Sequence, residues 1–344
     1  MRSGSRIAWV DGARAVGILA IVFSHAVYGE GAAAQACYAF HVPLFCFCAG
    51  WVFHGEKTPF PAFVWKRVLT TLLPWALFCL ISIALYAVGA GRVMSVLGEV
   101  KDPSPLHALR DMLKGYCYAN SPLWFLPCFF LQQLLLRLLT GLPLCRRKPV
   151  PCLTAAAVLS AAASWLYLSR PHAQIPWAAD TAVILLPFAC LGALLRRLPE
   201  PRLRGLPRAA VGAALTAGGL LLSVFVNTKV NYWDNEYGQP LLFYAIAILT
   251  VYGLMLLLSA PPSLPGAVLR VGQDSLGILL MHKFPILFFQ VFVPFASGAM
   301  RAAAFGPSLA VSAVCVAMCC AVMIPLRRWA PWTIGERRNP RPSP

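Results

Sequence analysis

Three ionisable residues stand inside an apolar stretch near the start of the chain. The segment from Ile7 to Tyr28 is long enough to cross a bilayer, which takes about 20 residues at about 1.5 Å each, yet it carries Asp11, Arg14 and His25. Such groups are costly at membrane depth unless they are paired or face a wet cavity. Among them, only the imidazole of His25 exchanges a proton near neutral pH, so it is the candidate general base or nucleophile.

The spacing of these residues predicts one polar helix face. Arg14 and His25 are eleven positions apart, which is about three turns and about 16 Å along the same side of a helix. Asp11 and Arg14 are three positions apart and can form an ion pair on that side. We therefore predict a charged pair near the start of this helix and a titratable imidazole near its end. A structural ion pair and a structural histidine are the alternatives.

A second histidine opens the next apolar run, which reads Phe40-His41-Val42-Pro43-Leu44-Phe45 and continues to Ala49-Gly50. If the first helix runs outward, this one runs back. His25 and His41 would then lie side by side at similar depth in the membrane. The alternative for His41 is a polar link between the two helices.

Composition defines the class of protein. The 344 residues are 59% hydrophobic and 12% charged, with a mean hydropathy of +0.69, whereas a soluble domain carries about 25% charged residues. We predict an all-α polytopic membrane protein, with a single membrane domain over residues 1–330 and a cytoplasmic Pro/Arg-rich tail over 331–344. The first segment is no cleavable signal peptide, because it is long, carries charges and is followed directly by further spans.

Hydropathy predicts ten spans, and the basic residues orient them. The spans lie near 7–28, 38–54, 68–90, 121–143, 150–169, 178–198, 207–227, 239–259, 274–296 and 303–326. With the N-terminus in the cytoplasm, nineteen of the 29 Lys and Arg residues fall in inside segments, as the positive-inside rule requires. Both termini are then cytoplasmic. The net charge of +17 reflects this topology and not nucleic-acid binding. The twelve cysteines show no metal-type spacing, so we predict neither a disulfide framework nor a metal site.

Two predicted outer loops carry polar side chains. In the loop from Arg92 to Asn120, the residues His107, Arg110, Asp111 and Lys114 have the spacing of an amphipathic surface helix. The loop from Asn227 to Gln239 contains Asn231, Tyr232, Trp233, Asp234, Asn235, Glu236 and Tyr237. Aromatic faces with amide and carboxylate partners suit a sugar, although Tyr and Trp are also ordinary membrane-interface residues.

Five motifs in order resemble those of the acyltransferase-3 family of integral membrane O-acyltransferases, most closely its fucose 4-O-acetylase-like branch. They are Trp9-Val10-Asp11-Gly12-Ala13-Arg14 with Ser24-His25-Ala26; Phe40-His41 to Gly50; Lys66-Arg67 before Leu73-Pro74-Trp75; Leu123-Trp124-Phe125-Leu126-Pro127; and Ser275-Leu276-Gly277-Ile278-Leu279-Leu280-Met281-His282. The resemblance covers residues 6 to 295. Thr70 departs from it, because the family usually has a second basic residue three positions after the first.

The resemblance implies a bundle of ten helices around a central cavity, in a protein of the bacterial inner (plasma) membrane. It implies acyl transfer from cytoplasmic acyl-CoA, most simply acetyl-CoA, to a hydroxyl of a cell-envelope or exported carbohydrate, with no bound cofactor. His25 would be the catalytic residue. The substrate-binding residues would be Asp11, Arg14, His41, Lys66, Arg67, Trp124 and His282.

Several roles stay open at the level of sequence. Arg14, Lys66 and Arg67 are cationic partners for the phosphates of the donor, whereas His41, Trp124 or His282 could stabilise the oxyanion of the tetrahedral intermediate. Trp124 and His282 also fit purely structural roles. Direct transfer and a covalent acyl-His25 intermediate both satisfy the sequence. A secondary transporter of a small solute is the alternative function, although the repeated halves with matching broken helices typical of transporters are not evident.

Overall fold

The computed structural model describes residues 7–27, 31–90, 104–200, 202–227, 230–293 and 304–336, together with residues 298 and 302. Within these ranges the regular elements are helices, and a single isolated bridge joins Asn231 to Glu236. Among the described residues, eight helices are long and apolar enough to cross a membrane, or ten if each of two bent pairs forms one span. The predicted all-α polytopic fold is confirmed. Residues 92–103 of the predicted outer loop and 337–344 of the predicted tail lie outside the described residues.

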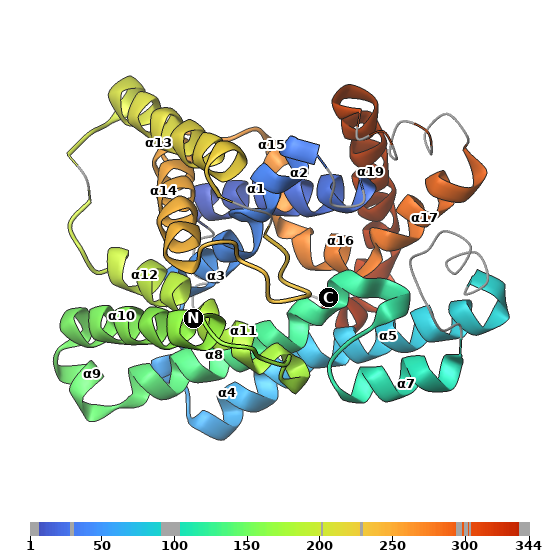
Figure 1. Cartoon of the computed structure of the whole chain (residues 1–344), viewed down its shortest axis with the longest axis horizontal. Helices are drawn as coiled ribbons and strands as arrows, with labels where there is room; N and C mark the ends of the chain where they lie inside the picture. Colours follow the sequence, from blue (N-terminus) through green and yellow to red (C-terminus); the bar gives the residue numbers. More distant parts are fainter. Residues whose placement is uncertain are drawn as a thin grey trace, which may run out of the picture.

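The first five spans follow the predicted order (Figure 1). They are α1 (Ala8–Ala26); α2 (Gly31–Tyr38) with α3 (His41–Trp51); α4 (Phe60–Arg67) with the π-helical turns η2 (Val68–Leu72) and η3 (Tyr86–Ala90) around α5 (Leu73–Leu85); α7 (Pro105–Leu113), η4 (Tyr118–Trp124) and α8 (Phe125–Gly141); and α10 (Pro149–Leu168), preceded by the short α9 (Pro143–Arg147). The helix predicted around His107 to Lys114 is therefore present as α7.

The remaining helices complete the bundle. They are η5 (Pro176–Ala178) with α11 (Ala179–Ile184) and α12 (Leu186–Leu195); α13 (Gly205–Phe225); α14 (Pro240–Leu258); α15 (Gly266–Gln273), α16 (Ser275–Met281) and α17 (Lys283–Phe292); α19 (Phe305–Trp329); and η6 (Pro331–Ile334). The third span begins at Phe60, earlier than the predicted 68, and so Lys66 and Arg67 lie on the helix itself. Pro61 suits the first turn of that helix, because its missing amide hydrogen would have had no helical acceptor there.

Two of the predicted spans are bent. The axes of α11 and α12 differ by 47°, and those of α16 and α17 by 42°, with His282 at the second break. Each bend is followed within a few residues by a proline, Pro187 or Pro285, which donates no backbone hydrogen bond and displaces the preceding turn. Two backbone carbonyls near the breaks accept hydrogen bonds from side chains. Gln132 donates to Leu185 O at 3.0 Å, and Asn120 donates to Leu280 O at 3.1 Å.

Helix α1 lies at the centre of the bundle, with α14 on one side and α19 on the other (Figure 1). It also contacts α3, α15, α16 and α17, and its apolar side chains, including Ile18 and Val22, are buried. Helix α15 approaches it most closely at Gly272, where a Cβ would lie 1.8 Å from the carbonyl oxygen of Asp11. By contrast, α13 exposes Leu206, Leu221 and Phe225 on its outer side, as expected for a helix that faces lipid.

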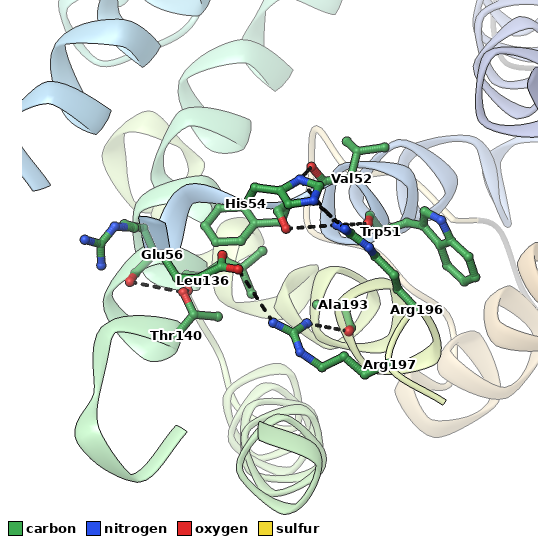
Figure 2. A network of polar contacts seen from close by, with 11 residues as sticks. Trp51, Val52, His54, Glu56, Leu136, Thr140, Ala193, Arg196 and Arg197 are labelled. Atoms are coloured by element: carbon green, nitrogen blue, oxygen red, sulfur yellow. Dashed lines mark hydrogen bonds and ion pairs between the residues drawn. The ribbon is translucent and has the colours of Figure 1, made fainter. Parts of the chain in front are cut away.

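A network of arginines closes the bundle where α3 and α12 end (Figure 2). Arg196 donates to the carbonyl oxygens of Trp51 and Phe53 at 3.1 and 3.3 Å and also contacts His54. Arg197 donates to Ala193 O at 2.7 Å and lies 3.9 Å from Glu56. Carbonyls at the end of a helix lack helical donors and carry partial negative charge, so these guanidinium groups have a structural function there.

Candidate active site

Two cavities lie along α1, one near each end. The first, which we call the histidine cavity, has a volume of about 360 Å³. Its wall is formed by Ile21, His25, Tyr38, His41, Val42, Tyr118, Ser121, Pro122, Trp124, Phe125, Asn231, Tyr232, Trp233, Leu279 and Lys283. The predicted neighbours His25 and His41 therefore face one space, together with Trp124.

His25 lies in the last turn of α1 and is half-buried in this wall. Its ring centroid is 5.4 Å from that of His282, which stands at the break between α16 and α17. Lys283 follows His282 directly; it is buried and lines the same cavity. The bend in this span thus brings an imidazole and an ammonium group to the end of α1.

The hydrogen bonds of the two other histidines define their tautomers. His41 Nδ1 lies 2.7 Å from Cys37 O, and His282 Nδ1 lies 3.0 Å from both Ile278 O and Leu279 O. A carbonyl oxygen only accepts, so each Nδ1 carries the hydrogen and each neutral ring presents Nε2 as an acceptor. His282 is fully buried, and within the described part of the chain its Nε2 has no hydrogen-bond partner.

Aromatic side chains form much of the remaining wall. Trp124, from the end of η4, stacks on Tyr232 with ring centroids 6.3 Å apart and planes inclined by 23°. His41 packs against Tyr38 and Tyr232, at 5.1 and 5.7 Å between centroids. The Tyr232 hydroxyl donates to Tyr38 O at 2.8 Å, and burial raises the pKa of this phenol well above its ordinary value. Tyr232 is therefore a neutral donor whose position is fixed.

A buried carboxylate anchors the loop that carries Asn231, Tyr232 and Trp233. Asp180 Oδ2 accepts a hydrogen bond from Asn235 Nδ2 at 2.5 Å and from the Tyr167 hydroxyl at 3.1 Å. The Asn231–Glu236 bridge closes the loop above them. Because a satisfied buried network fixes its members, the loop presents its amide and aromatic groups to the cavity in one arrangement.

The second cavity, which we call the arginine cavity, has a volume of about 280 Å³. It is lined by Arg14, Phe45, Ala49, Arg67, Thr70, Thr71, Phe125, Leu126, Phe129, Gln273, Ser275, Leu276, Leu279 and Gly335. Phe125 and Leu279 therefore line both cavities. These two buried side chains form the partition between them.

The guanidinium groups of the arginine cavity are held in different ways. Arg14 pairs with Asp11 at 3.7 Å, as the spacing predicts, and Asp11 also accepts a hydrogen bond from Gln273 at 3.3 Å. Arg67 lies over the ring of Phe63 at 5.2 Å, and its Nε is buried with no hydrogen-bond partner in the described part of the chain. Two cations facing one small space, one of them with a free donor, form a site suited to an anion.

The predicted site residues thus fall into two groups. His25, His41, Trp124 and His282 gather at the histidine cavity, whereas Asp11, Arg14 and Arg67 gather at the arginine cavity. Lys66 is exposed and lines neither. Sequence reasoning omitted several lining residues from the site, chiefly Lys283, Gln273, Ser275, Phe125 and Leu279. Phe125, Ser275 and Leu279 stand inside the fourth and fifth motifs, whereas Lys283 directly follows the fifth motif and Gln273 lies two positions before it.

Comparison of the chain with known protein families identifies one family. The family model Acyl_transf_3, described as an acyltransferase domain, matches residues 7–326. The chain belongs to this family. It is a membrane acyltransferase, and both cavities lie within the matched residues except for Gly335. Neither the curated proteins nor the solved structures gave a match.

Proposed function

We propose that this acyltransferase transfers an acyl group, acetyl in the simplest case, from acyl-CoA in the arginine cavity to a carbohydrate hydroxyl in the histidine cavity. One observation carries the proposal: Arg14 and His25, three turns apart on α1, line two cavities that meet at Phe125 and Leu279. The cationic cavity suits the phosphates of a CoA donor. The aromatic and amide groups of the other suit a neutral sugar.

His25 is the general base in this proposal. Its imidazole takes the proton of the acceptor hydroxyl while that oxygen attacks the thioester carbon. The C–S bond of the tetrahedral intermediate then breaks, and the protonated imidazole returns the proton to the leaving CoA sulfur. Release of CoA in the absence of acceptor, with an acyl group retained on His25, would distinguish a covalent intermediate from direct transfer.

The tautomers assign roles to the neighbouring side chains. Since the Nδ1 hydrogens of His41 and His282 bind carbonyls, these neutral rings have no N–H left for the oxyanion. The indole N–H of Trp124 and the ammonium group of Lys283, which line the cavity, are the donors suited to the oxyanion. His282 Nε2 is suited to accept a hydrogen bond from His25 and so to orient it, as the third member of a catalytic triad does.

The proposed orientation has the arginine cavity on the cytoplasmic side. The segments that line it, around Arg67, Gln273 and Gly335, are those predicted inside from the basic residues, whereas the residues from 118 to 121 and 231 to 233 are predicted outside. Reporter fusions at Leu144 and Gly205 should read inside, and a fusion at Asn235 outside. An outside reading at Gly205 contradicts this orientation and the cytoplasmic donor with it.

The experiment that tests the function follows the acyl group itself. Membranes containing the protein are supplied with acetyl-CoA labelled in the acetyl group, and the glycans are compared with those of cells that lack the protein. We expect label in an alkali-labile ester on a carbohydrate. A transporter would move solute without consuming acetyl-CoA. The bent spans, sixth and ninth in order, do not occupy matching places in two halves, so they do not favour that alternative.

A further inference from the structure

The chain continues beyond the last span into a short segment that turns back onto the arginine cavity. After α19 ends at Trp329, η6 packs against η2, α5, α16 and α19, and Pro331, Thr333 and Ile334 are buried. Gly335 then forms part of the cavity wall. The first residues of the predicted tail over 331–344 therefore pack against the helices of the bundle.

Gly335 is the residue that allows this approach. Its φ is +72°, in the left-handed region that favours glycine, and a Cβ there would lie 2.5 Å from the carbonyl oxygen of Thr70. Thr70 lines the same cavity. Because glycine has no side chain, it is the backbone at Gly335 that faces the space beside Arg67 and Thr70.

A pair of carboxylates fixes the segment through Arg327. The Arg327 guanidinium binds Glu336 through Nε at 2.9 Å and Nη2 at 2.8 Å, and Nη2 also lies 2.5 Å from Asp274 Oδ1. Asp274 is buried and stands between Gln273 and Ser275, which both line the cavity. Paired, partly buried ions of this kind resist displacement, because separating them leaves a buried charge without a partner.

These contacts connect the segment to the predicted phosphate-binding arginine. Glu336 pairs with Arg327, Arg327 with Asp274, and the residue before Asp274, Gln273, donates to Asp11, which pairs with Arg14. Arg14 and the Gly335 backbone therefore belong to opposite ends of one polar chain around a single cavity. A displacement of Glu336 would therefore change the positions of both Gly335 and Arg14.

We infer that the segment Pro331–Glu336 is a wall of the acyl-donor site and that Arg327, held between Asp274 and Glu336, is the positioning residue that sets its place. The inference rests on the proposed binding of acyl-CoA in the arginine cavity. The segment closes the part of the cavity beside Arg67 and limits how the CoA phosphates and pantetheine lie there. It acts on donor affinity and leaves the acceptor side unchanged.

The test measures the binding of coenzyme A to the purified full-length protein by calorimetry, with the thermal unfolding midpoint as a check of folding. Gly335→Ala should raise the Kd for coenzyme A about tenfold, because the new Cβ cannot share the space of Thr70 O. Gly205→Ala is the matched control: its φ is +54° and a Cβ there meets nothing within 4 Å. It should leave the Kd within about twofold, as expected for a surface site.

A second pair of variants separates positioning from folding. Glu336→Gln removes the ion pair with Arg327 and should raise the Kd a few-fold, whereas Glu336→Asp keeps the charge and should restore most of the affinity. Arg67→Ala reports on the donor site independently of the segment. If Arg67→Ala weakens binding but Gly335→Ala and Glu336→Gln do not, the segment is no part of the site and this inference is wrong. If none of the three changes the Kd, the donor binds elsewhere, and the proposed function loses its donor site as well.

Discussion

The histidine cavity and the arginine cavity are lined by different chemistry, although they share α1 and a two-residue partition. The first is lined by residues of α1, α3 and α8 and of a loop anchored by Asp180, and it presents imidazole, indole and amide groups together with the ammonium group of Lys283. The second is lined by residues near both the beginnings and the ends of helices and by Gly335 of the Pro331–Glu336 segment, and it presents two guanidinium groups with hydroxyls and an amide. In the proposed function, the two guanidinium groups attract the polyanionic donor, whereas the aromatic and amide groups of the histidine cavity receive a neutral acceptor.

Turnover and donor affinity should therefore depend on different cavities. Changes in the histidine cavity should act on turnover, because its groups face the reacting hydroxyl and carbonyl in the proposal. Changes in the arginine cavity should act on donor affinity, because its cations face phosphates that do not react. A substitution in one cavity should therefore leave the property assigned to the other cavity unchanged.

The largest effect is expected at His25. His25→Ala should lower turnover by about 10²–10⁴-fold, the usual loss when a general base is removed, with donor affinity unchanged because the phosphate contacts lie about three turns away. Native activity should fall as the pH drops through the imidazole pKa, since only the neutral ring accepts the proton. Steady-state assays of the purified protein measure both. A variant that retains more than about a tenth of native turnover rules out His25 as the base.

Trp124→Phe should lower turnover about a hundredfold, because it keeps the aromatic stack on Tyr232 and removes only the N–H proposed for the oxyanion. Tyr232→Phe removes the hydroxyl that donates to Tyr38 O. It is the matched control, because it also removes one polar group from the Trp124–Tyr232 stack and keeps both rings. It should affect acceptor KM more than turnover. Equal losses of turnover in both variants would indicate that Trp124 acts by packing alone.

Arg67→Ala should raise the donor KM about ten- to hundredfold, corresponding to the loss of one charge-assisted contact of about 1.5–3 kcal/mol. Arg196→Ala removes a guanidinium on the same predicted side, where it binds carbonyls at the end of α3, and should lower the unfolding midpoint while the donor KM stays unchanged. If Arg67→Ala raises the acceptor KM instead, the assignment of the two cavities is reversed.

The family motifs and helix periodicity predicted much of this organisation. The pairing of Asp11 with Arg14 follows from spacing within one helix, and the closeness of His25 to His41 follows from the order of two consecutive helices. Such local relations are encoded by the 3.6-residue period and the length of a span. The places of the apolar spans along the chain could be predicted for the same reason, and within the described residues they correspond to eight helices, or ten if each bent pair is one span.

Contacts between residues distant in sequence could not be predicted in this way. Beside the bend at His282, Leu280 O accepts a hydrogen bond from Asn120 of a distant segment, and the partition combines Phe125 of α8 with Leu279 of α16. Gly335 reaches Thr70 across more than 260 positions. For Lys66, the motif position suggested a contact with the acyl donor, but its side chain is exposed outside both cavities.

His282→Ala should lower turnover about tenfold, since it removes the acceptor proposed to orient His25 and leaves the base itself in place. The double variant with His25→Ala should be no slower than His25→Ala alone, because residues that act as one unit are not additive. A further loss in the double variant would show that His282 acts independently of His25, for instance on a bound substrate.

The smallest effect is expected at the partition, and it concerns selectivity. If the acyl group passes between Phe125 and Leu279 to reach His25, their size limits the acyl chain, because a hydrophobic pocket discriminates by about tenfold or more for one methylene. Leu279→Ala should therefore raise the rate with butyryl-CoA relative to acetyl-CoA about three- to tenfold. Leu276→Ala is the matched control, one turn earlier on α16 and lining the arginine cavity alone. If both variants shift the ratio equally, the selectivity arises within the donor cavity, and the acyl group does not cross where the two cavities meet.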